Sequence, residues 1–311
     1  ASNIAIGDSA LGSNTTASDN TAVGQSALAA NTTGLKHTAV GRNALDAVTT
    51  VSELTAVGYN ALTANTTGAS NSAFGSYCLQ ADTTGQQNTG VGYAAAYQTT
   101  TGSNNTAVGD FSLGGNTTGS GNVGLGSGAG DAITTGSNNI IIGSGADVSA
   151  ADGSGANVLG RNVSGAAGYT TLGSGSDDIR AAHGNVTWAT VSDERVKKDI
   201  EDSTVGLNFI NDLRPVTFNY KNKGDLPTEF KGYEEDSTEV YKSEKSQHGF
   251  IAQEVKAAID KHSDIKNGFS MWDNDDETGQ QRVGETALIP MLTKAVQELS
   301  AKVEELESKL N

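Results

Sequence analysis

The sequence predicts a mainly β protein: a trimeric parallel β-solenoid, or β-roll, of 17-residue coils, followed by a small α+β domain that ends in a coiled-coil helix. Three observations support this prediction. A short sequence motif recurs every 17 residues, the composition changes sharply near residue 190, and the C-terminus carries a heptad pattern of apolar residues. We therefore divide the chain into a repeat shaft at 1–173, a neck at 174–191, and a C-terminal domain at 192–311 whose coiled coil occupies about 288–311.

The repeat combines a short apolar stretch with a glycine and a turn. Its best preserved copy reads Asn-Thr-Ala-Val-Gly at 20–24, Ala-Leu at 27–28 and Asn-Thr-Thr-Gly at 31–34. A β-branched residue directly before glycine favours a short strand, and the polar turn residues favour tight corners over a helix. Each unit is therefore expected to form one coil that adds about 4.8 Å along the axis. The glycines that mark ten copies in step are Gly7, Gly24, Gly41, Gly58, Gly75, Gly92, Gly109, Gly126, Gly143 and Gly160, and an out-of-step copy closes at Gly173.

Two columns of apolar residues emerge when the units are aligned, and we expect both to fill the solenoid core. The first column directly precedes the glycines: Ile6, Val23, Val40, Val57, Phe74, Val91, Val108, Leu125, Ile142 and Leu159. The second is mostly leucine: Leu11, Leu28, Leu45, Leu62, Leu79, Ala96 and Leu113. Two such side chains hardly offset the conformational entropy that is lost when a coil is ordered. An obligate oligomer is therefore expected, in which three copies pack about one axis.

The charge distribution argues against several kinds of partner. Residues 1–191 carry 11 acidic and 4 basic side chains, and residues 192–311 carry 25 and 16, so the net charges are −7 and −9. Nucleic acids and anionic lipids both need a basic surface, so neither is expected to bind. No run approaches 18 apolar residues, and we expect neither membrane insertion nor a secretory leader.

Isolated polar residues of the repeat are expected to have structural roles. Cys78 occupies a slot that holds alanine in neighbouring units, which predicts a small buried side chain. The Asn-x-Thr/Ser sites and the paired threonines are expected to stabilise corners, in preference to carrying glycans or facing ice or sugar hydroxyls. The histidines His37, His183 and His262 are too scattered for a metal site, and we expect no metal and no cofactor.

The repeat resembles the head of trimeric bacterial adhesins of the YadA type, a left-handed β-roll built on Asn-x-x-Ala-Ile-Gly-like repeats. The resemblance covers residues 3–160, although the unit is longer here than in that family. Similar rolls occur in phage tail fibres. The resemblance therefore implies the shape of this region more firmly than its biology.

Three sequence blocks follow the repeat. They are Ser-Asp-Glu-Arg-Val-Lys-Lys-Asp-Ile at 192–200, Leu-Arg-Pro-Val-Thr-Phe-Asn-Tyr at 213–220, and His-Gly-Phe-Ile-Ala-Gln-Glu-Val at 248–255. In this order, and followed by an amphipathic helix, they resemble the intramolecular chaperone domain of phage tailspikes and fibres, the peptidase S74 family. In that family the domain trimerises, aligns the β-rich chains that precede it, and cuts itself away at the serine of a Ser-Asp-x-Arg-x-Lys motif.

The resemblance implies a site for self-cleavage. It places the scissile bond between Val191 and Ser192, with Ser192 as the nucleophile and Lys197 as the base of a Ser–Lys dyad. The further residues that support the motifs are Asp193, Arg195, His248, Gly249, Phe250, Gln253 and Glu254. The activity implied is a single-turnover serine peptidase that acts on its own chain and on no external substrate.

The chemistry of such a dyad is demanding. A serine hydroxyl needs a base to take its proton, and a lysine amine is that base only where burial or nearby cations lower its pKa. Arg195 and Lys198 are nearby cations. Positions 192 and 197 point to opposite faces of a strand and lie roughly 140° apart on a helix, so the pair needs a turn or a lysine from a neighbouring subunit. Asp193 shares its position with the family motif but fits the structural role of an N-cap or turn former equally well. For His248 we favour a structural hydrogen bond over catalysis.

The rest of the C-terminal domain yields three expectations. Phe218, Tyr220, Phe250 and Ile251 are expected to form its core. The polar segments 222–247 and 264–283 are candidate chaperone arms, because comparable protrusions embrace the fibre in the S74 family. A coiled-coil seam with valine at a and leucine at d is expected from Leu292, Val296, Leu299, Val303, Leu306 and Leu310.

Three functions stay open at this stage. The first is a homotrimeric phage tail fibre, made and assembled in the host cytoplasm, whose β-roll is a structural or receptor-facing part of the virion and binds a host glycan or protein. The second is a trimeric adhesin or structural fibre whose C-terminal domain trimerises without cutting. The third, a polysaccharide-degrading tailspike, is disfavoured because the acidic residues of the repeat are isolated at corners.

Overall fold

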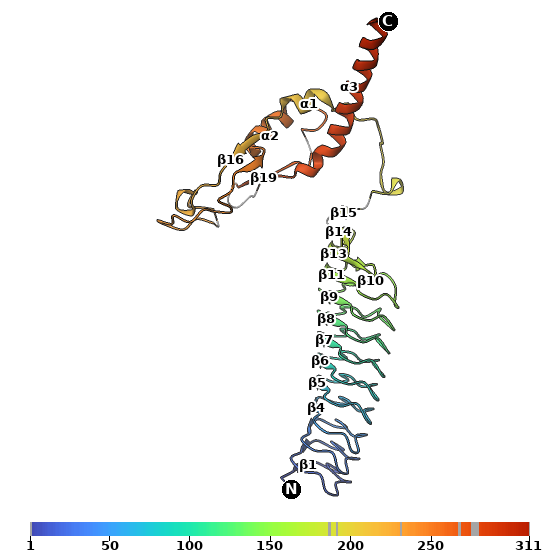
Figure 1. Ribbon diagram of the computed structural model, residues 1–311. Helices are drawn as coiled ribbons and strands as arrows, with labels where there is room; N and C mark the ends of the chain where they lie inside the picture. Colours follow the sequence, from blue (N-terminus) through green and yellow to red (C-terminus); the bar gives the residue numbers. More distant parts are fainter. Residues whose placement is uncertain are drawn as a thin grey trace. The chain divides into compact units, whose positions relative to one another are not determined.

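The structure is a computed structural model, which describes residues 2–185, 188–190, 192–230, 232–266, 269–274 and 280–310 (Figure 1). The chain divides into two compact units, Ala1–Val196 and Lys197–Asn311. Each unit is described by itself below.

The N-terminal unit is the predicted parallel β-solenoid. Each coil contributes one three-residue strand, and consecutive strands pair in parallel with residues 17 apart opposite each other, as Ala22 lies opposite Ala39. The ladder of coils is seen from the side in Figure 1. The strands of these coils are β1 (Ile4–Ile6), β2 (Thr21–Val23), β3 (Thr38–Val40), β4 (Thr55–Val57), β5 (Ser72–Phe74), β6 (Thr89–Val91), β7 (Thr106–Val108), β8 (Val123–Leu125) and β9 (Ile140–Ile142).

The last coils change the direction of pairing. The out-of-step copy is confirmed, because Gly173 lies opposite Gly160 in a coil that is shorter than the others. After this coil the chain reverses, and two antiparallel strands continue the same sheet. The elements of this end are β10 (Asp147–Val148), β11 (Asn157–Arg161), β12 (Ser164–Gly165), β13 (Tyr169–Ser174), β14 (Asp177–Ala182), β15 (Ala189–Thr190) and the 3-10 helix η1 (Glu194–Val196).

The core of the solenoid contains only one of the two predicted columns. Leucines of the second column, such as Leu28 and Leu113, are fully buried. The prediction is wrong for the column before the glycines, since Ile6 is 60% exposed and Leu125 is 46% exposed. Neighbouring strand residues point to opposite faces, and the middle residue of each strand, such as Ala22, points inward. The residues that precede the glycines therefore form an apolar column on the outside.

Each coil turns corners that demand unusual backbone conformations. Gly24 has φ +133°, and a Cβ at this position would lie 2.6 Å from the carbonyl oxygen of Gly41 in the next coil. Only glycine fits such a close approach. Leu28 and Leu45 have φ of 52° and 53°, in the left-handed region that bulky residues rarely adopt. Burial of these leucines therefore holds the backbone in a strained conformation.

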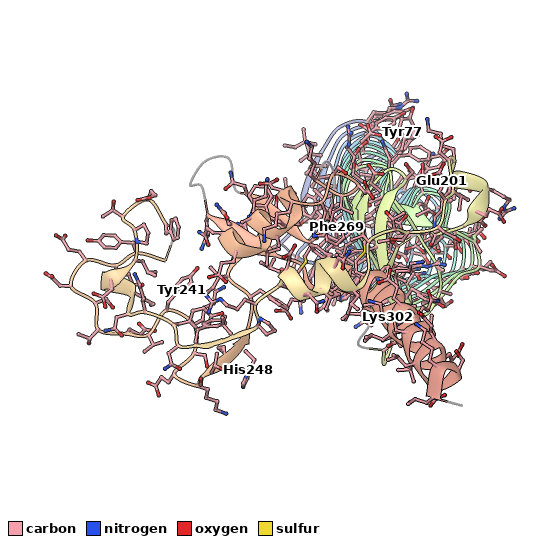
Figure 2. The ribbon with its side chains drawn as sticks, turned by 90° about the horizontal axis from the view of Figure 1, so that it is seen from above. Tyr77, Glu201, Tyr241, His248, Phe269 and Lys302 are labelled. Carbon is pink, nitrogen blue, oxygen red and sulfur yellow. The ribbon has the colours of Figure 1, made fainter. Side chains whose placement is uncertain are left out.

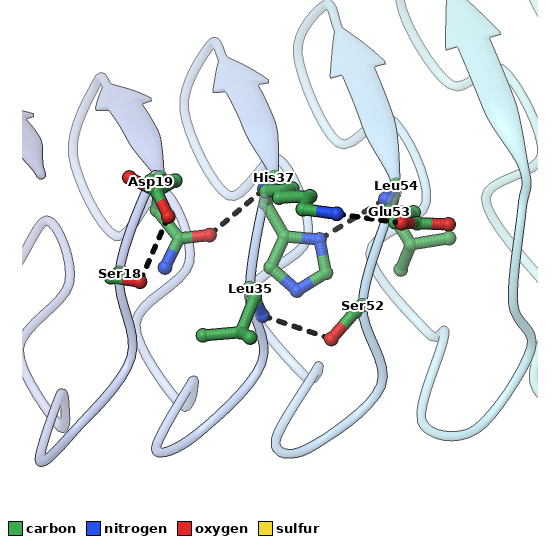
Figure 3. Close-up of polar contacts among 9 residues, drawn as sticks. Ser18, Asp19, Leu35, His37, Ser52, Glu53 and Leu54 are labelled. Carbon is green, nitrogen blue, oxygen red and sulfur yellow. Dashed lines mark hydrogen bonds and ion pairs between the residues drawn. The ribbon is translucent and has the colours of Figure 1, made fainter. Parts of the chain in front are cut away.

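Asparagine side chains form a buried ladder along the solenoid. The Oδ1 atom of Asn88 accepts from the backbone N–H of Asn105 at 3.0 Å, and Nδ2 of Asn105 donates to the carbonyl of Gly119 at 2.9 Å. His37 takes the same place in its coil: Nδ1 accepts from the N–H of Leu54 (Figure 3). Its other ring nitrogen, Nε2, donates to the carbonyl of Val51. Burial lowers the pKa of His37. The neutral imidazole thus replaces an amide.

Other polar residues of the repeat have the structural positions expected of them. Oδ1 of Asn31 accepts from the backbone N–H of Gly34 at 3.0 Å, which is a corner role. Threonine hydroxyls donate to carbonyls of the next coil, as Thr32 does to Thr49. Cys78 is buried, and desolvation raises the pKa of its thiol to about 12.

The C-terminal unit is a small α+β domain. Two antiparallel strand pairs, β16–β17 and β18–β19, accompany three α-helices among the described residues. Helix α1 packs against the first half of α3, where Glu298 accepts from the N–H of Leu207 at 2.9 Å. The elements of the C-terminal unit are α1 (Leu207–Asp212), β16 (Val216–Phe218), η2 (Lys223–Asp225), β17 (Gln247–Gly249), α2 (Ala252–Asp260), β18 (Trp272–Asn274), β19 (Gln281–Val283), η3 (Glu285–Leu288) and α3 (Ile289–Leu310).

The core of this unit differs from the expected one. Phe250 packs against it as expected, but Phe218 and Tyr220 are only half-buried and Ile251 is exposed. These side chains lie at the end of the domain that carries β16 and β17. The core itself lies between the helices and comprises Val205, Phe209, Val255, Ala258, Ile259, Met271 and Leu288.

Candidate cleavage and assembly site

A tight turn follows the predicted nucleophile. The carboxylate of Asp193 accepts from the backbone N–H of Arg195 at 2.9 Å and also binds both Nε and Nη2 of its guanidinium, at 2.9 and 2.6 Å. Hydrogen bonding to Arg195 lowers the pKa of Asp193. The side chain therefore acts as a turn former, one of the two roles expected for it. Because Arg195 is paired with this carboxylate, its charge is less effective on other groups nearby.

Ser192 and Lys197 lie on the two sides of the unit boundary. Ser192 is exposed and lies two residues after β15, the last strand of the solenoid sheet. Lys197 is exposed and is the first residue of the C-terminal unit. Val191, on the other side of the predicted scissile bond, lies outside the described residues. The pairing of Ser192 with Lys197 therefore stays a prediction.

The structure brings the second and third blocks together. Strands β16 and β17 pair antiparallel, with Val216 opposite Gly249 and Thr217 opposite His248. Arg214 and Glu254 form a two-pronged ion pair, in which Nε donates to Oε2 at 2.9 Å and Nη2 donates to Oε1. This contact lowers the pKa of Glu254. The sequence contained no sign of it beyond the opposite charges, since 40 residues separate the partners.

The remaining motif residues have structural positions. Nδ1 of His248 lies 3.3 Å from Oγ1 of Thr217, which fits the hydrogen-bonding role favoured for this histidine. A Cβ on Gly249 would lie 3.2 Å from Oε1 of Glu285, so a larger residue would press on this carboxylate. Gln253 is exposed on the first turn of α2.

An open groove of about 830 Å³ lies beside these strands. Aromatic rings line it: Phe218 and Tyr220 are 5.4 Å apart between centroids, and Tyr220 and Tyr241 are 6.1 Å apart. The ammonium of Lys242 lies 5.6 and 5.2 Å from the two tyrosine rings. Tyr241 and His248 are labelled in this part of the domain in Figure 2. The groove includes part of the segment 222–247, one of the two candidate arms.

The predicted seam lies on a regular helix. Helix α3 covers Ile289–Leu310, and the face that holds Ala295 is buried against the domain. The seam residues share a second, exposed face of the helix. They are Leu292, Val296, Leu299, Val303, Leu306 and Leu310, and Val303, for example, is 52% exposed. The helix is therefore as predicted, with an apolar stripe directed away from the domain.

The described part of the chain offers no sign of two other kinds of site. No group of His, Cys, Asp and Glu among those residues could hold a metal ion. None of the helices described combines the length and the apolar character needed to cross a bilayer.

Comparison with known families identifies the C-terminal region. Residues 192–264 match the peptidase S74 family model, described as the chaperone of endosialidase. The match includes all three sequence blocks and confirms the resemblance of this region to that family. Together with the β-solenoid, it supports a role in folding and trimerisation for a fibre-like protein. No match was found among curated proteins or among solved structures.

Proposed function

We propose, on the basis of this family match, that residues 192–311 are a self-releasing assembly chaperone and that the β-roll before them is part of a homotrimeric phage tail fibre. The observation that carries the proposal is the match at 192–264, which contains the complete Ser-Asp-x-Arg-x-Lys motif. The solenoid provides a suitable client, because its pairing is parallel throughout the first nine strands and its strained coils depend on correct registration.

Assembly begins at helix α3. Helices gain most of their stability from packing an apolar face, and this 22-residue helix exposes its apolar stripe in a single chain, so helix formation and association support each other. Joining three chains at this point raises the effective concentration of their solenoids for one another. The outward apolar column, which includes Val40 and Val57, then supplies a face that the three solenoids bury together.

Cleavage follows assembly. In one chain Ser192 and Lys197 are both exposed, whereas a lysine serves as a base after burial has made its charged form unfavourable. Packing of three chains provides that burial, so a single chain is inactive. The turn held by Asp193 and Arg195 orients the residues that follow Ser192. A cut before Ser192 releases the chaperone just after β15 and leaves every strand of the solenoid sheet in the fibre.

The groove beside β16 and β17 serves the client during folding. Its aromatic rings and Lys242 suit an extended, acidic chain, because the rings cover apolar surface and the ammonium attracts carboxylates. Residues 1–191 carry a net charge of −7, so the unfolded repeat has this character. Segment 222–247 thus holds client strands before they join the roll.

The decisive experiment compares the wild type with Ser192→Ala and with Ser203→Ala, a matched change nearby. The wild type and Ser203→Ala should yield fragments of about 19 and 13 kDa, as expected for 191 and 120 residues. Ser192→Ala should remain full length and trimeric. Cleavage of this variant between residues 191 and 192 would refute the assignment of the nucleophile.

Three further variants test the roles of Lys197 and Asp193. Lys197→Ala should also remain full length, and its co-expression with Ser192→Ala restores cutting only if the lysine acts from a neighbouring subunit. Asp193→Asn, which retains an acceptor for the N–H of Arg195, should be cut faster than Asp193→Ala. A wild-type chain that trimerises and never cuts would instead support the alternative of a non-cleaving trimeric adhesin or structural fibre.

A further inference from the structure

An aromatic cluster lies on the outside of the solenoid, away from the predicted cleavage site in sequence. Tyr59 and Tyr77 meet edge to face with ring centroids 5.3 Å apart, and Tyr77 and Tyr93 meet in the same way at 5.7 Å. Tyr97 and Phe111 lie 6.1 Å apart in the adjoining coils. Figure 2 shows Tyr77 at the outer surface of the roll. We call these five residues the aromatic ladder.

The ladder is a local feature of a polar face. Its members Tyr59, Tyr77, Tyr93 and Phe111 occupy the first and second positions after the corner glycines. In most other coils these two positions are polar or small: Asp8 and Ser9, Gln25 and Ser26, Arg42 and Asn43, Ser127 and Gly128, and Ser144 and Gly145. A face that packed against other copies along the roll would be apolar in every coil, as the column before the glycines is. The ladder therefore has a purpose that is specific to its own coils.

Backbone strain supports a functional reading. The second position after each glycine has a left-handed backbone, with φ of 60° at Tyr77 and 54° at Phe111. Serine, asparagine and glycine suit such positions, whereas a bulky aromatic residue there is unusual. Strain of this kind concentrates at functional sites. The two large rings at Tyr77 and Phe111 are therefore exceptions to the small or polar residues that other coils place in this slot.

The chemistry of the ladder suits a sugar. Tyr59 is 37% exposed and Tyr93 is 54% exposed, so a ligand can reach part of each ring. The C–H faces of sugar rings stack on such aromatic rings, and polar neighbours bind the hydroxyls. The guanidinium of Arg42 lies 5.9 Å from the centre of the Tyr59 ring, and Nδ2 of Asn43 donates to Oδ1 of Asn60 beside it at 2.9 Å.

The spacing of the tyrosines and the charge of the solenoid narrow the class of sugar ligand further. Tyr59 and Tyr93 belong to coils two apart, a separation of roughly 9.6 Å along the axis, which is close to the length of two sugar rings in an extended glycan. Tyr77 lies edge-on between them and holds both rings in place. The net charge of −7 on residues 1–191 opposes polyanions. We infer that the aromatic ladder binds a neutral, extended polysaccharide along the solenoid axis, with Tyr59 and Tyr93 stacking on alternate sugars.

The test is native electrophoresis of the full-length protein through gels that contain dextran, mannan, galactan or the anionic polygalacturonate. At least one of the three neutral polymers should retard the wild type. The double variant Tyr59→Gln/Tyr93→Gln should raise the apparent Kd at least tenfold, and it should fold because Gln25 occupies the same slot in another coil. Trp188→Gln, which removes an exposed ring outside both the ladder and the apolar column, should bind like the wild type.

Four binding results would overturn the inference, and so would one change of oligomeric state. The binding results are no retardation by any neutral polymer, retardation by polygalacturonate alone, equal retardation of the double variant, and equal weakening by Trp188→Gln. Light scattering on the same samples shows whether the double variant keeps its oligomeric state. If it dissociates, the ladder is a contact between copies of the chain and not a sugar site. Cleavage at Ser192 is measured separately. Failure of the sugar-binding inference is therefore distinguishable from failure of the proposed self-cleavage.

Discussion

The Nδ1 atom of His37 accepts a hydrogen bond from the backbone N–H of Leu54 at 3.2 Å, in a position where other coils use an asparagine amide (Figure 3). The opposite ring nitrogen, Nε2, donates to the carbonyl of Val51 at 2.8 Å. One nitrogen must therefore accept and the other must donate. A protonated imidazole cannot do both, because its two nitrogens are donors.

This arrangement predicts that the contribution of His37 to the stability of the solenoid is lost in mild acid. Burial holds the pKa of His37 below its usual value of 6.5. As the pH falls below about 6.5, the unfolded chain takes up a proton that the folded chain excludes, so the free energy of unfolding decreases until folded His37 is protonated too. His37→Asn should lose less stability between pH 7 and pH 5 than the wild type. Thermal unfolding followed by circular dichroism measures this difference, and parallel pH profiles would contradict the prediction.

Asp82 has the opposite pH dependence. It occupies a corner slot that holds Asn31 and Asn65 in other coils, and burial raises its pKa to about 7. From pH 4 to pH 7 the unfolded carboxyl loses its proton while the folded one keeps it, so stability falls as the pH rises. Asp82→Asn should therefore stabilise the protein at pH 8, by on the order of a few kcal/mol at about 1.4 kcal/mol per pKa unit.

Asn31 shows how the new amide would bind: its Oδ1 accepts from Gly34, as Oδ1 of Asp82 does from Gly85 at 2.8 Å. The gain should shrink at pH 4, where the folded carboxyl is protonated and about half of the unfolded carboxyls are protonated too. The control is Asp19→Asn at an exposed corner, which should change stability little at either pH. A loss of stability in Asp82→Asn at pH 8 would show that Asn71, which donates to Oδ2 of Asp82, needs a carboxylate.

One leucine from the inner apolar column and one from the outer column allow the two columns to be compared by mutation. Leu113 is fully buried and Leu125 is 46% exposed. Leu113→Ala should destabilise the solenoid by about 2–5 kcal/mol because it leaves a cavity. Leu125→Ala should cost the single chain much less and should weaken association of the chains. Chemical denaturation and sedimentation measure the two effects, and equal loss of stability in both variants would place Leu125 in a core.

The seam of α3 is expected to control assembly and, through it, cleavage. Val303→Glu places a charge in the centre of the apolar stripe and should raise the dissociation constant at least tenfold. Gln297→Glu makes the same change of charge on an exposed position off the seam and should leave assembly intact. Light scattering reports the oligomeric state, and gels report fragments. A monomeric Val303→Glu chain that is still cut would show that cleavage does not require assembly.

Much of the fold was readable from the sequence, because a repeat copies the same local structure many times. The 17-residue period predicts the coils and their parallel pairing, and the heptads predict α3. Single residues at the site were readable only through the resemblance of three blocks to the S74 family. The contact between Arg214 and Glu254 was not, since a pair of opposite charges 40 residues apart has many possible partners.

The sequence by itself determined the repeat, the change of composition that follows it and the residue types of the chaperone motif, since all three depend only on the order of residues along the chain. Only the tertiary structure decided which apolar column lies inside. Packing directs the middle residue of a strand, such as Ala22, inward and leaves the residue before the glycine, such as Leu125, on the outer face, because neighbouring strand residues point to opposite sides. The same stacking brings Tyr59, Tyr77 and Tyr93 into contact, because residues about 17 apart in the sequence lie only about 4.8 Å apart along the solenoid axis.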